Sequence, residues 1–340
     1  HHGNGTEEIF RDDPRVLMVS IFQHPFYPES GIDGRSGRMV NVPLGAGSSG
    51  AQFREAVTRE WLPALHRFEP QLIFVSAGFD APEATREQLL RVHDAAHLDR
   101  LAEISPSSGH VEIDPDTLMN PHTLAAARRA AGAAVLATDL VMRGEAEAAF
   151  CSVRPPGHHA GRGRAMGFCF FNNVAVGVAH ALEHHGLTRV AIADFDVHHG
   201  NGTEEIFRDD PRVLMVSIFQ HPFYPESGIE GRSGRMVNVP LGAGSSGAQF
   251  REAVTREWLP ALHRFEPQLI FVSAGFDAHR DDGMAMLRLV ESDYGWVTGT
   301  LRSVAERHAN GRIVSVLEGG YDLSVLGRCV EAHLRGLLGP

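Results

Sequence analysis

The chain has 340 residues, of which 43% are hydrophobic, and its 42 acidic and 31 basic side chains give a formal net charge of −11. That length allows one large α/β domain or two smaller ones, and the acidic balance argues against a nucleic-acid surface while it is compatible with basic substrates. Because three cysteines are too few for a disulfide framework and no apolar stretch approaches the roughly 18 residues of a membrane span, we expect a cytoplasmic protein without a membrane partner.

The first 81 residues repeat a later part of the chain. Residues 1–81 match residues 198–278 position by position, and only Asp33 against Glu230 differs. Repeat architectures use units of about 20 to 50 residues that diverge in sequence, so this block indicates a duplication or a joining of two related sequences. A sheet has one place for each strand, and residues 198–278 keep their natural neighbours on both sides. We therefore expect residues 198–278 in the core, and residues 1–81 at the periphery, disordered, or swapped into another molecule of a homo-oligomer.

The rest of the chain alternates between helical and strand-like patterns. Residues 82–104 and 121–144 have helical patterns, and a polar surface loop joins them. β-branched runs follow at residues 148–153, 189–195, 213–219, 268–274 and 312–318. Helical patterns lie between or after them at residues 172–185, 248–265, 286–309 and 323–338. This order predicts a mainly parallel sheet with helices on both faces and with ligands beyond the carboxyl ends of its strands.

Two of the predicted strands end in side chains that suit a metal ion. Asp194, Asp196 and His198 alternate along the end of one strand, so they can face a single point. A second strand delivers Asp277. Two aspartates and one histidine make a three-ligand zinc site with a position left for water. The alternative is that such residues only cap helices, but the presence of two motifs of this kind favours the metal site.

Further polar residues follow two other strands. His158 and His159 lie in a Gly/Pro turn, and they could act as general acid and base because an imidazole titrates near pH 6.5. Tyr321 ends the turn Glu318-Gly319-Gly320-Tyr321 and could donate a hydrogen bond to an oxyanion. The alternatives are that His158 and His159 are solvated histidines of a loop, and that the segment with Tyr321 is an ordinary turn.

Five motifs, in this order, resemble those of the histone deacetylase family, in particular its class II and bacterial members. They are RPPGHHA (154–160), GFCFFNN (167–173), DFDVHHGNGT (194–203), SAGFDAHRDD (273–282) and LEGGYDL (317–323). The resemblance covers about residues 83–340. It implies the arginase/deacetylase-like α/β fold, with a mostly parallel eight-stranded sheet and helices on both faces. Residues 82–340 would then form the catalytic domain, without the strand and helix with which relatives usually begin.

The resemblance also implies roles for individual residues. It makes Asp196, His198 and Asp277 the zinc ligands, and it makes His158, His159, Asp194, Asn201 and Tyr321 the catalytic residues. In this set His159 is the general base and acid, and Asp194 orients His158. Asn201 stands where some relatives have an aspartate behind the second histidine, and its amide can still orient the ring.

Substrate and cation sites come from the same resemblance. Phe168, with Gly167 before it, and Tyr224 would wall a narrow tunnel for an acyl-lysine-like chain. Asp116 aligns with a rim aspartate that holds the substrate backbone, although a solvated surface acid is the alternative. Potassium would be a second ion, held by Asp194, by Asp196 and by backbone carbonyls near His198, Ser217 and Ile218.

The implied reaction is zinc-dependent hydrolysis of an amide, with an acetylated lysine peptide, an acetylpolyamine or another small acylamide as substrate. Two alternatives are an impaired protein that binds acyl-lysine without turnover and an arginase-like binuclear hydrolase. The binuclear enzyme needs more carboxylates, and only Asp281 and Asp282 are spare nearby. Residues 1–81 lack equivalents of the histidine pair and of Asp194, Asp196 and Tyr321, so we expect no second active site there.

Overall fold

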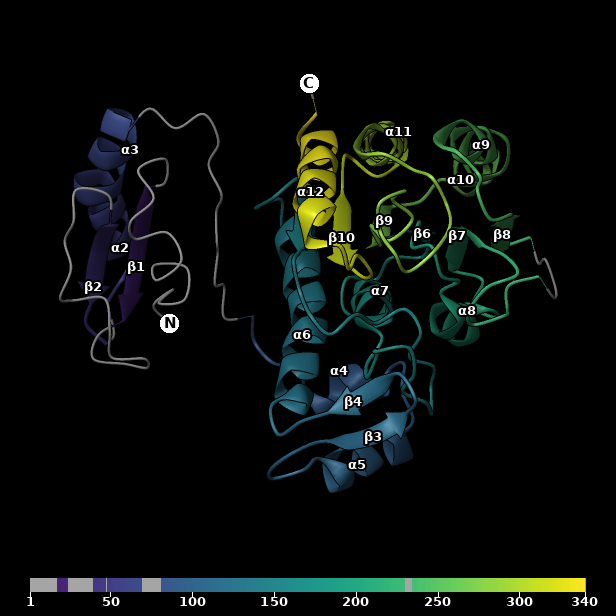
Figure 1. Cartoon of the computed structure of the whole chain (residues 1–340), viewed down its shortest axis with the longest axis horizontal. Coiled ribbons are helices and arrows are strands. Elements are labelled where there is room, and N and C mark those ends of the chain that lie inside the picture. Colours follow the sequence, from purple (N-terminus) through teal and green to yellow (C-terminus); the bar gives the residue numbers. More distant parts are fainter. Residues whose placement is uncertain (1–16, 24–38, 47, 69–80, 230–233, 340) are drawn as a thin grey trace. The chain divides into compact units, whose positions relative to one another are not determined.

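The computed structural model of the chain describes residues 17–23, 39–46, 48–68, 81–229 and 234–339. The chain divides into two compact units, His1–Phe79 and Asp80–Pro340, which are described separately below (Figure 1).

The first unit contains a small parallel α/β element. Its strands β1 (Met18–Gln23) and β2 (Met39–Leu44) pair in parallel, and the helical segments α2 (Gly50–Ala56), η1 (Val57–Trp61) and α3 (Leu62–Phe68) follow them. The repeated sequence in the second unit folds in the same order, as β7 (Val213–Gln220), β8 (Met236–Leu241), α9 (Gly247–Ala253), η2 (Val254–Trp258) and α10 (Leu259–Phe265). Local sequence therefore determines this element in both places.

The surroundings of the two copies differ. Phe53 of α2 is 45% exposed, whereas its counterpart Phe250 is 1% exposed and packs in the core of the second unit. In the second unit β7 also pairs with β6 (Val190–Asp194), so this copy is part of a larger sheet. The described residues of the second copy therefore contribute to the larger sheet and its core, and the place of residues 1–81 stays a prediction.

The second unit is built on a parallel sheet of six described strands in the order β5-β10-β9-β6-β7-β8, two fewer than the eight that the resemblance implied. The strands not yet defined are β5 (Ala148–Cys151), β9 (Leu269–Ala274) and β10 (Ile313–Leu317). Along β6, Val190 and Ile192 join one hydrophobic core, while Ala191 and Ala193 join the other. This alternation shows that both faces of the sheet are covered.

Helices cover each face, as Figure 1 shows. The helices α6 (Thr123–Met142) and α7 (Asn173–Glu183) share one core, whereas α9, α11 (Glu291–His308) and α12 (Leu323–Leu338) share the other. The short helix α8 (Asn201–Phe207) follows the motif after β6. None of the helices in the described residues is long and apolar enough to cross a membrane.

The segment before α6 differs from its prediction. The predicted helix over residues 82–104 is divided into α4 (Arg86–Leu90) and α5 (Ala95–Ile104). The region predicted as a polar surface loop contains an antiparallel hairpin, β3 (Val111–Asp114) and β4 (Thr117–Met119). The loop prediction was wrong. In β4 only Thr117 and Met119 are buried. An alternation of buried and exposed residues over three positions is a weak strand signal in a polar sequence.

A neutral histidine is buried in the second unit. His333 is 0% exposed, with Nδ1 at 2.7 Å from the Thr298 hydroxyl and Nε2 at 2.8 Å from the Ser315 hydroxyl. The Thr298 hydroxyl donates to the Tyr294 carbonyl, so it accepts from His333 Nδ1–H, and Ser315 then donates to Nε2. Burial lowers the pKa of His333 to about 3.

This histidine makes the folded state sensitive to acid. We expect the unfolded ring to bind a proton below its ordinary pKa of about 6.5 while the folded ring stays neutral, so stability falls as the pH falls. The wild type should therefore lose about 2 kcal/mol of unfolding free energy relative to His333→Gln when the pH falls from 7 to 5. This value uses about 1.36 kcal/mol per pH unit below the ordinary pKa of the unfolded ring. Urea titrations at both pH values measure it. A difference that does not change with pH would show that His333 titrates alike in both states.

Candidate metal centre

The carboxyl ends of three neighbouring strands bring the polar motifs together. The strands β10, β9 and β6 are adjacent in the sheet, and all three run in the same direction. The strand β6 leads into Asp196 and His198, β9 leads into Asp277, and β10 leads into the turn that carries Tyr321. The motifs therefore meet at one edge of the sheet, as expected for a parallel α/β fold.

Asp196, His198 and Asp277 form a buried group with a geometry suited to a metal ion. His198 Nδ1 lies 3.0 Å from Asp196 Oδ1 and 3.2 Å from Asp277 Oδ2, and the three residues are at most 7% exposed. One ligand atom from each of them lies within 4.8 Å of the other two. Two carboxylates and an imidazole are a donor set that zinc accepts.

A bound cation would also satisfy a costly buried group. Asp277 Oδ2 has no partner with hydrogen-bond geometry in the described residues, although His198 is close. Burial and the neighbouring Asp196 carboxylate raise the pKa of Asp277 to about 6, as expected for a carboxylate that lacks a sufficient counter-charge. At Gly319 a Cβ atom would lie 2.1 Å from this same oxygen, so only glycine leaves the carboxylate its place.

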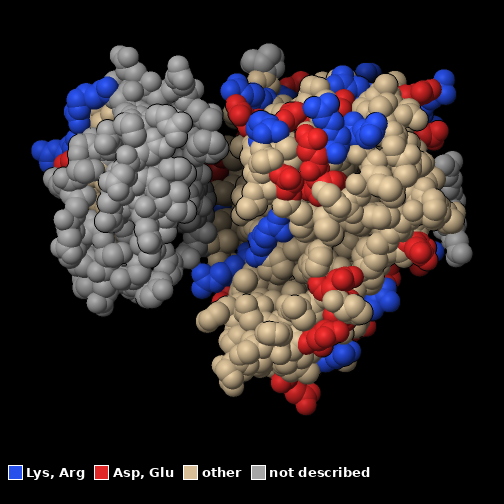
Figure 2. All heavy atoms as spheres, viewed as in Figure 1, with Lys and Arg blue, Asp and Glu red and all other residues tan. Residues whose placement is uncertain are grey.

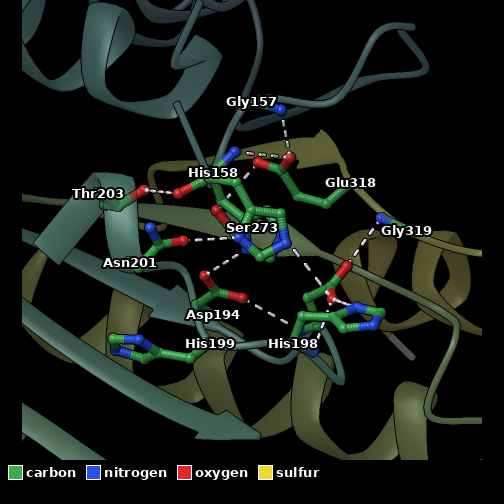
Figure 3. Close-up of polar contacts among 12 residues, drawn as sticks. Gly157, His158, Asp194, His198, His199, Asn201, Thr203, Ser273, Glu318 and Gly319 are labelled. Atoms are coloured by element: carbon green, nitrogen blue, oxygen red, sulfur yellow. Dashed lines mark hydrogen bonds and ion pairs between the residues drawn. The ribbon is translucent and has the colours of Figure 1, made fainter. Parts of the chain in front are cut away.

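The histidine pair lies beside this group, and its two rings have different partners. His158 Nδ1 is 3.1 Å from Asp194 Oδ2 (Figure 3). His159 Nδ1 is 2.8 Å from Asn201 Oδ1. The ring centroids are 4.0 Å apart. Asp194 and Asn201 thus contact the two rings at the positions that the resemblance implied, and their catalytic roles stay a prediction.

The different partners separate the titration of the two rings. Burial lowers the pKa of His158, but the charges of Asp196 and Asp194 outweigh it and raise the pKa to about 10. Burial and the adjacent charge of His158 hold the pKa of His159 well below its ordinary value. One ring is therefore charged and the other neutral at neutral pH, which makes His159 the ring that can accept a proton.

Glu318 holds the histidine loop, a role that was not predicted. Its Oε2 accepts hydrogen bonds from the backbone N–H groups of Gly157, at 2.6 Å, and His158, at 3.1 Å (Figure 3). Its Oε1 accepts from the Ser273 hydroxyl at 3.2 Å. Mainly because of burial, the pKa of Glu318 is raised to about 7. The available signal was a glutamate directly after an apolar strand, where a charged side chain needs a buried partner.

The turn that carries Tyr321 is also held by a carboxylate. Asp282 Oδ2 accepts from the backbone N–H groups of Tyr321, at 2.7 Å, and Asp322, at 3.0 Å. Asp282 is one of the two spare carboxylates near the motifs, but it is 3% exposed and accepts hydrogen bonds from this backbone. The other, Asp281, has a side chain that is 53% exposed. Burial and the Asp277 and Asp196 charges raise the pKa of Tyr321, so the phenol stays protonated and can donate.

Two aromatic residues, Phe168 and Tyr224, lie beside Tyr321 and His159 and are called the aromatic wall below. Tyr224 has its ring centroid 5.3 Å from that of His159, and the Phe168 ring lies 5.9 Å from the Tyr321 ring. Gly167 has a φ of 55°, and a Cβ atom there would lie 2.5 Å from the His159 ring. Glycine at this position therefore lets the aromatic wall approach the histidine.

Two other predicted regions have clear places in the fold. Asp116 lies in the turn between β3 and β4, and the next residue, Thr117, accepts a hydrogen bond from Phe168 N–H at 3.1 Å. The hairpin with Asp116 therefore borders the aromatic wall. In the predicted potassium region, Asp194 pairs with Ser217 in the β6–β7 ladder, and Ile218 follows it. The Ser217 hydroxyl is buried and has no partner in the described residues.

Comparisons with known proteins find related chains and a related fold. A family model for the histone deacetylase domain matches residues 1–84 and residues 81–337. A histone deacetylase-like amidohydrolase of Pseudomonas aeruginosa is 44% identical over 269 residues, which cover 76% of this chain and 70% of the relative. A probable deacetylase of Methanothermobacter thermautotrophicus is 38% identical over 291 residues, which cover 83% of this chain and 84% of the relative. The crystal structure of the HDA15 HD domain matches with a TM-score of 0.73 and 35% identity, covering 77% of this chain and 76% of that chain.

Proposed function

The chain belongs to the histone deacetylase family, and from this premise we propose that it is a zinc-dependent amidohydrolase that removes the acetyl group from an acetylated lysine or a related acylated amine. The observation that carries the proposal is the joint placement of a buried Asp/His/Asp group and an oriented histidine pair at one edge of the sheet.

Asp196, His198 and Asp277 would hold the metal. When bound, zinc supplies a Lewis acid and lowers the pKa of a coordinated water towards about 7. The residues fit this role because the donor set is right and because Asp277 Oδ2 lacks a hydrogen-bond partner in the described residues.

His159 moves the protons of the reaction. Its Nδ1 faces the Asn201 carbonyl oxygen at 2.8 Å, which keeps the proton on Nδ1 and leaves Nε2 free as the base. Nε2 takes a proton from water as the water oxygen bonds to the acyl carbon, and then gives that proton to the amine as the C–N bond breaks. The Tyr321 hydroxyl donates to the carbonyl oxygen as negative charge develops on it.

We infer a cytoplasmic protein whose substrate is an acetylated lysine peptide, an acetylpolyamine or another small acylamide, with potassium near Asp194 and Ser217 as a second ion. On the face in Figure 2, acidic and basic side chains are interspersed rather than gathered by sign, which gives no support to nucleic acid as a partner.

The test is release of acetate from an acetyl-lysine peptide and from an acetylated polyamine by the full chain. We expect turnover that stops after a chelator removes the metal and returns after zinc is added. The relative rates on the two substrates identify the substrate class. Binding of the acetyl-lysine peptide by the zinc-loaded protein without any acetate release would instead favour the impaired, acyl-lysine-binding protein.

A further inference from the structure

A second group of metal-ligand side chains lies outside the candidate centre, where α6 and α7 end. Asp139 belongs to the last turn of α6, His180 belongs to α7, and His184 and His185 directly follow α7. One ligand atom from each residue lies within 4.8 Å of those of the other three. His180 is buried, Asp139 and His185 are half-buried and His184 is exposed, so the group is open to solvent on one side.

The helix geometry brings two of these histidines together. His180 and His184 are four residues apart and therefore share one face of the helix end. Their rings are stacked, with centroids 4.7 Å apart and planes 13° apart. The carbonyl groups at a helix carboxyl end carry partial negative charge, which favours a cation there.

Asp139 joins the histidines into one cluster. Its Oδ1 lies 2.8 Å from His180 Nε2 and 2.8 Å from His185 Nε2. Burial raises the pKa of Asp139, but the hydrogen bonds with His180 and His185 outweigh it, so the carboxyl group is ionised. The cluster therefore combines one negative charge with three imidazoles.

We propose that Asp139, His180, His184 and His185 form a second binding site, for a divalent transition-metal ion such as Zn²⁺. Imidazole nitrogen and carboxylate oxygen are the donors that such ions prefer. The pairs now 2.8 Å apart need to open only to about 3.3 Å, the distance between ligands of a tetrahedral ion with bonds of about 2.0 Å. Asp139 and His185 are half-buried, so solvent borders part of each side chain.

Arg91 opposes binding and gives the proposal a test of its own. Its NH1 group lies 3.1 Å from His180 Nδ1, and a guanidinium only donates, so the proton of the neutral ring sits on Nε2. An ion at Nε2 requires this proton to move to Nδ1 and Arg91 to move away. Arg91 lines a cavity of about 940 Å³, which leaves space for that movement.

The experiment measures zinc bound by the full chain after chelator treatment and dialysis against Zn²⁺, with metal content determined by mass spectrometry. His184→Ala and His185→Ala should each bind one zinc ion fewer per chain than the wild type, or bind it at least tenfold more weakly. Acetate release should not change, because neither residue belongs to the candidate centre. In the described residues the His184 ring makes only aromatic contacts, with His180 and His185, so its loss leaves the fold intact.

Two further variants separate this site from general histidine effects. His263 forms an exposed pair with His308, at 3.0 Å, that belongs to no three-ligand group in the described residues, so His263→Ala should bind zinc like the wild type. Arg91→Gln should bind zinc more tightly than the wild type. Wild-type zinc content and affinity in both His184→Ala and His185→Ala would overturn the proposal. Weaker binding in Arg91→Gln would overturn the opposing role of Arg91 and the proton shift on His180 from which it is argued.

Discussion

Replacing Asp277 by alanine should abolish metal binding at the candidate centre and the proposed acetate release, whereas the same replacement of Asp80 should change neither. The two aspartates occupy matching positions in the repeated sequence. Asp277 is buried beside Asp196 and His198, so its removal leaves one carboxylate and one imidazole for the ion. A bound metal stabilises the transition state by several kcal/mol, and each step of about 1.36 kcal/mol corresponds to a tenfold change in rate. We therefore expect kcat/KM to fall about 10³-fold or more.

Asp80 is the matched control that the chain itself provides. Asp80 matches Asp277 in the repeated sequence but lies outside the described residues, whereas Asp277 lies with Asp196 and His198 in the described metal-ligand group. Metal content and acetate release measured together on both variants decide the matter. If Asp80→Ala lost the metal and Asp277→Ala kept it, the first copy would occupy the place in the catalytic domain that we assign to the second.

Motifs at strand ends made the site predictable from the sequence. The parallel order of β6 and β9 brings Asp277 beside Asp196 and His198. Strand alternation does not place these two residues, because β6 ends at Asp194 and both lie in the bend that follows it. The resemblance paired His159 with Asn201, and the ring and the amide meet at 2.8 Å. These relations depend on strand direction and motif order, which a sequence expresses directly.

The supporting contacts were not predictable in the same way. Glu318 holds a loop 160 residues away in the sequence, and Asp282 holds the backbone of Tyr321 from another strand end. Each contact depends on how two loops approach, and no periodicity encodes that approach. The repeat gives the clearest case, because Phe53 and Phe250 have the same local sequence and helix but very different exposure. Burial of a side chain is set by the neighbours that the rest of the chain provides.

Replacing Tyr321 by phenylalanine should reduce kcat by about 10²- to 10³-fold and leave the zinc content and KM nearly unchanged. The hydroxyl is the only group removed, and the Asp282 contacts to the turn involve backbone N–H groups, so the turn itself is retained. The effect falls on kcat because a donor to a developing oxyanion acts mainly in the transition state.

Tyr294→Phe is the matched control for this variant. The Tyr294 side chain is buried, and its hydroxyl has no hydrogen-bond partner in the described residues, so the same chemical change there removes no contact of the site. Steady-state kinetics and metal analysis on both variants compare one hydroxyl at the site with one in the core. Activity of Tyr321→Phe within a few fold of the wild type would show that another group stabilises the oxyanion. Tyr294 packs on Phe195 and Phe276, which are next to the metal-ligand residues in the sequence. A large loss of activity in Tyr294→Phe would therefore show that packing in the core, rather than the phenol of Tyr321, controls the rate.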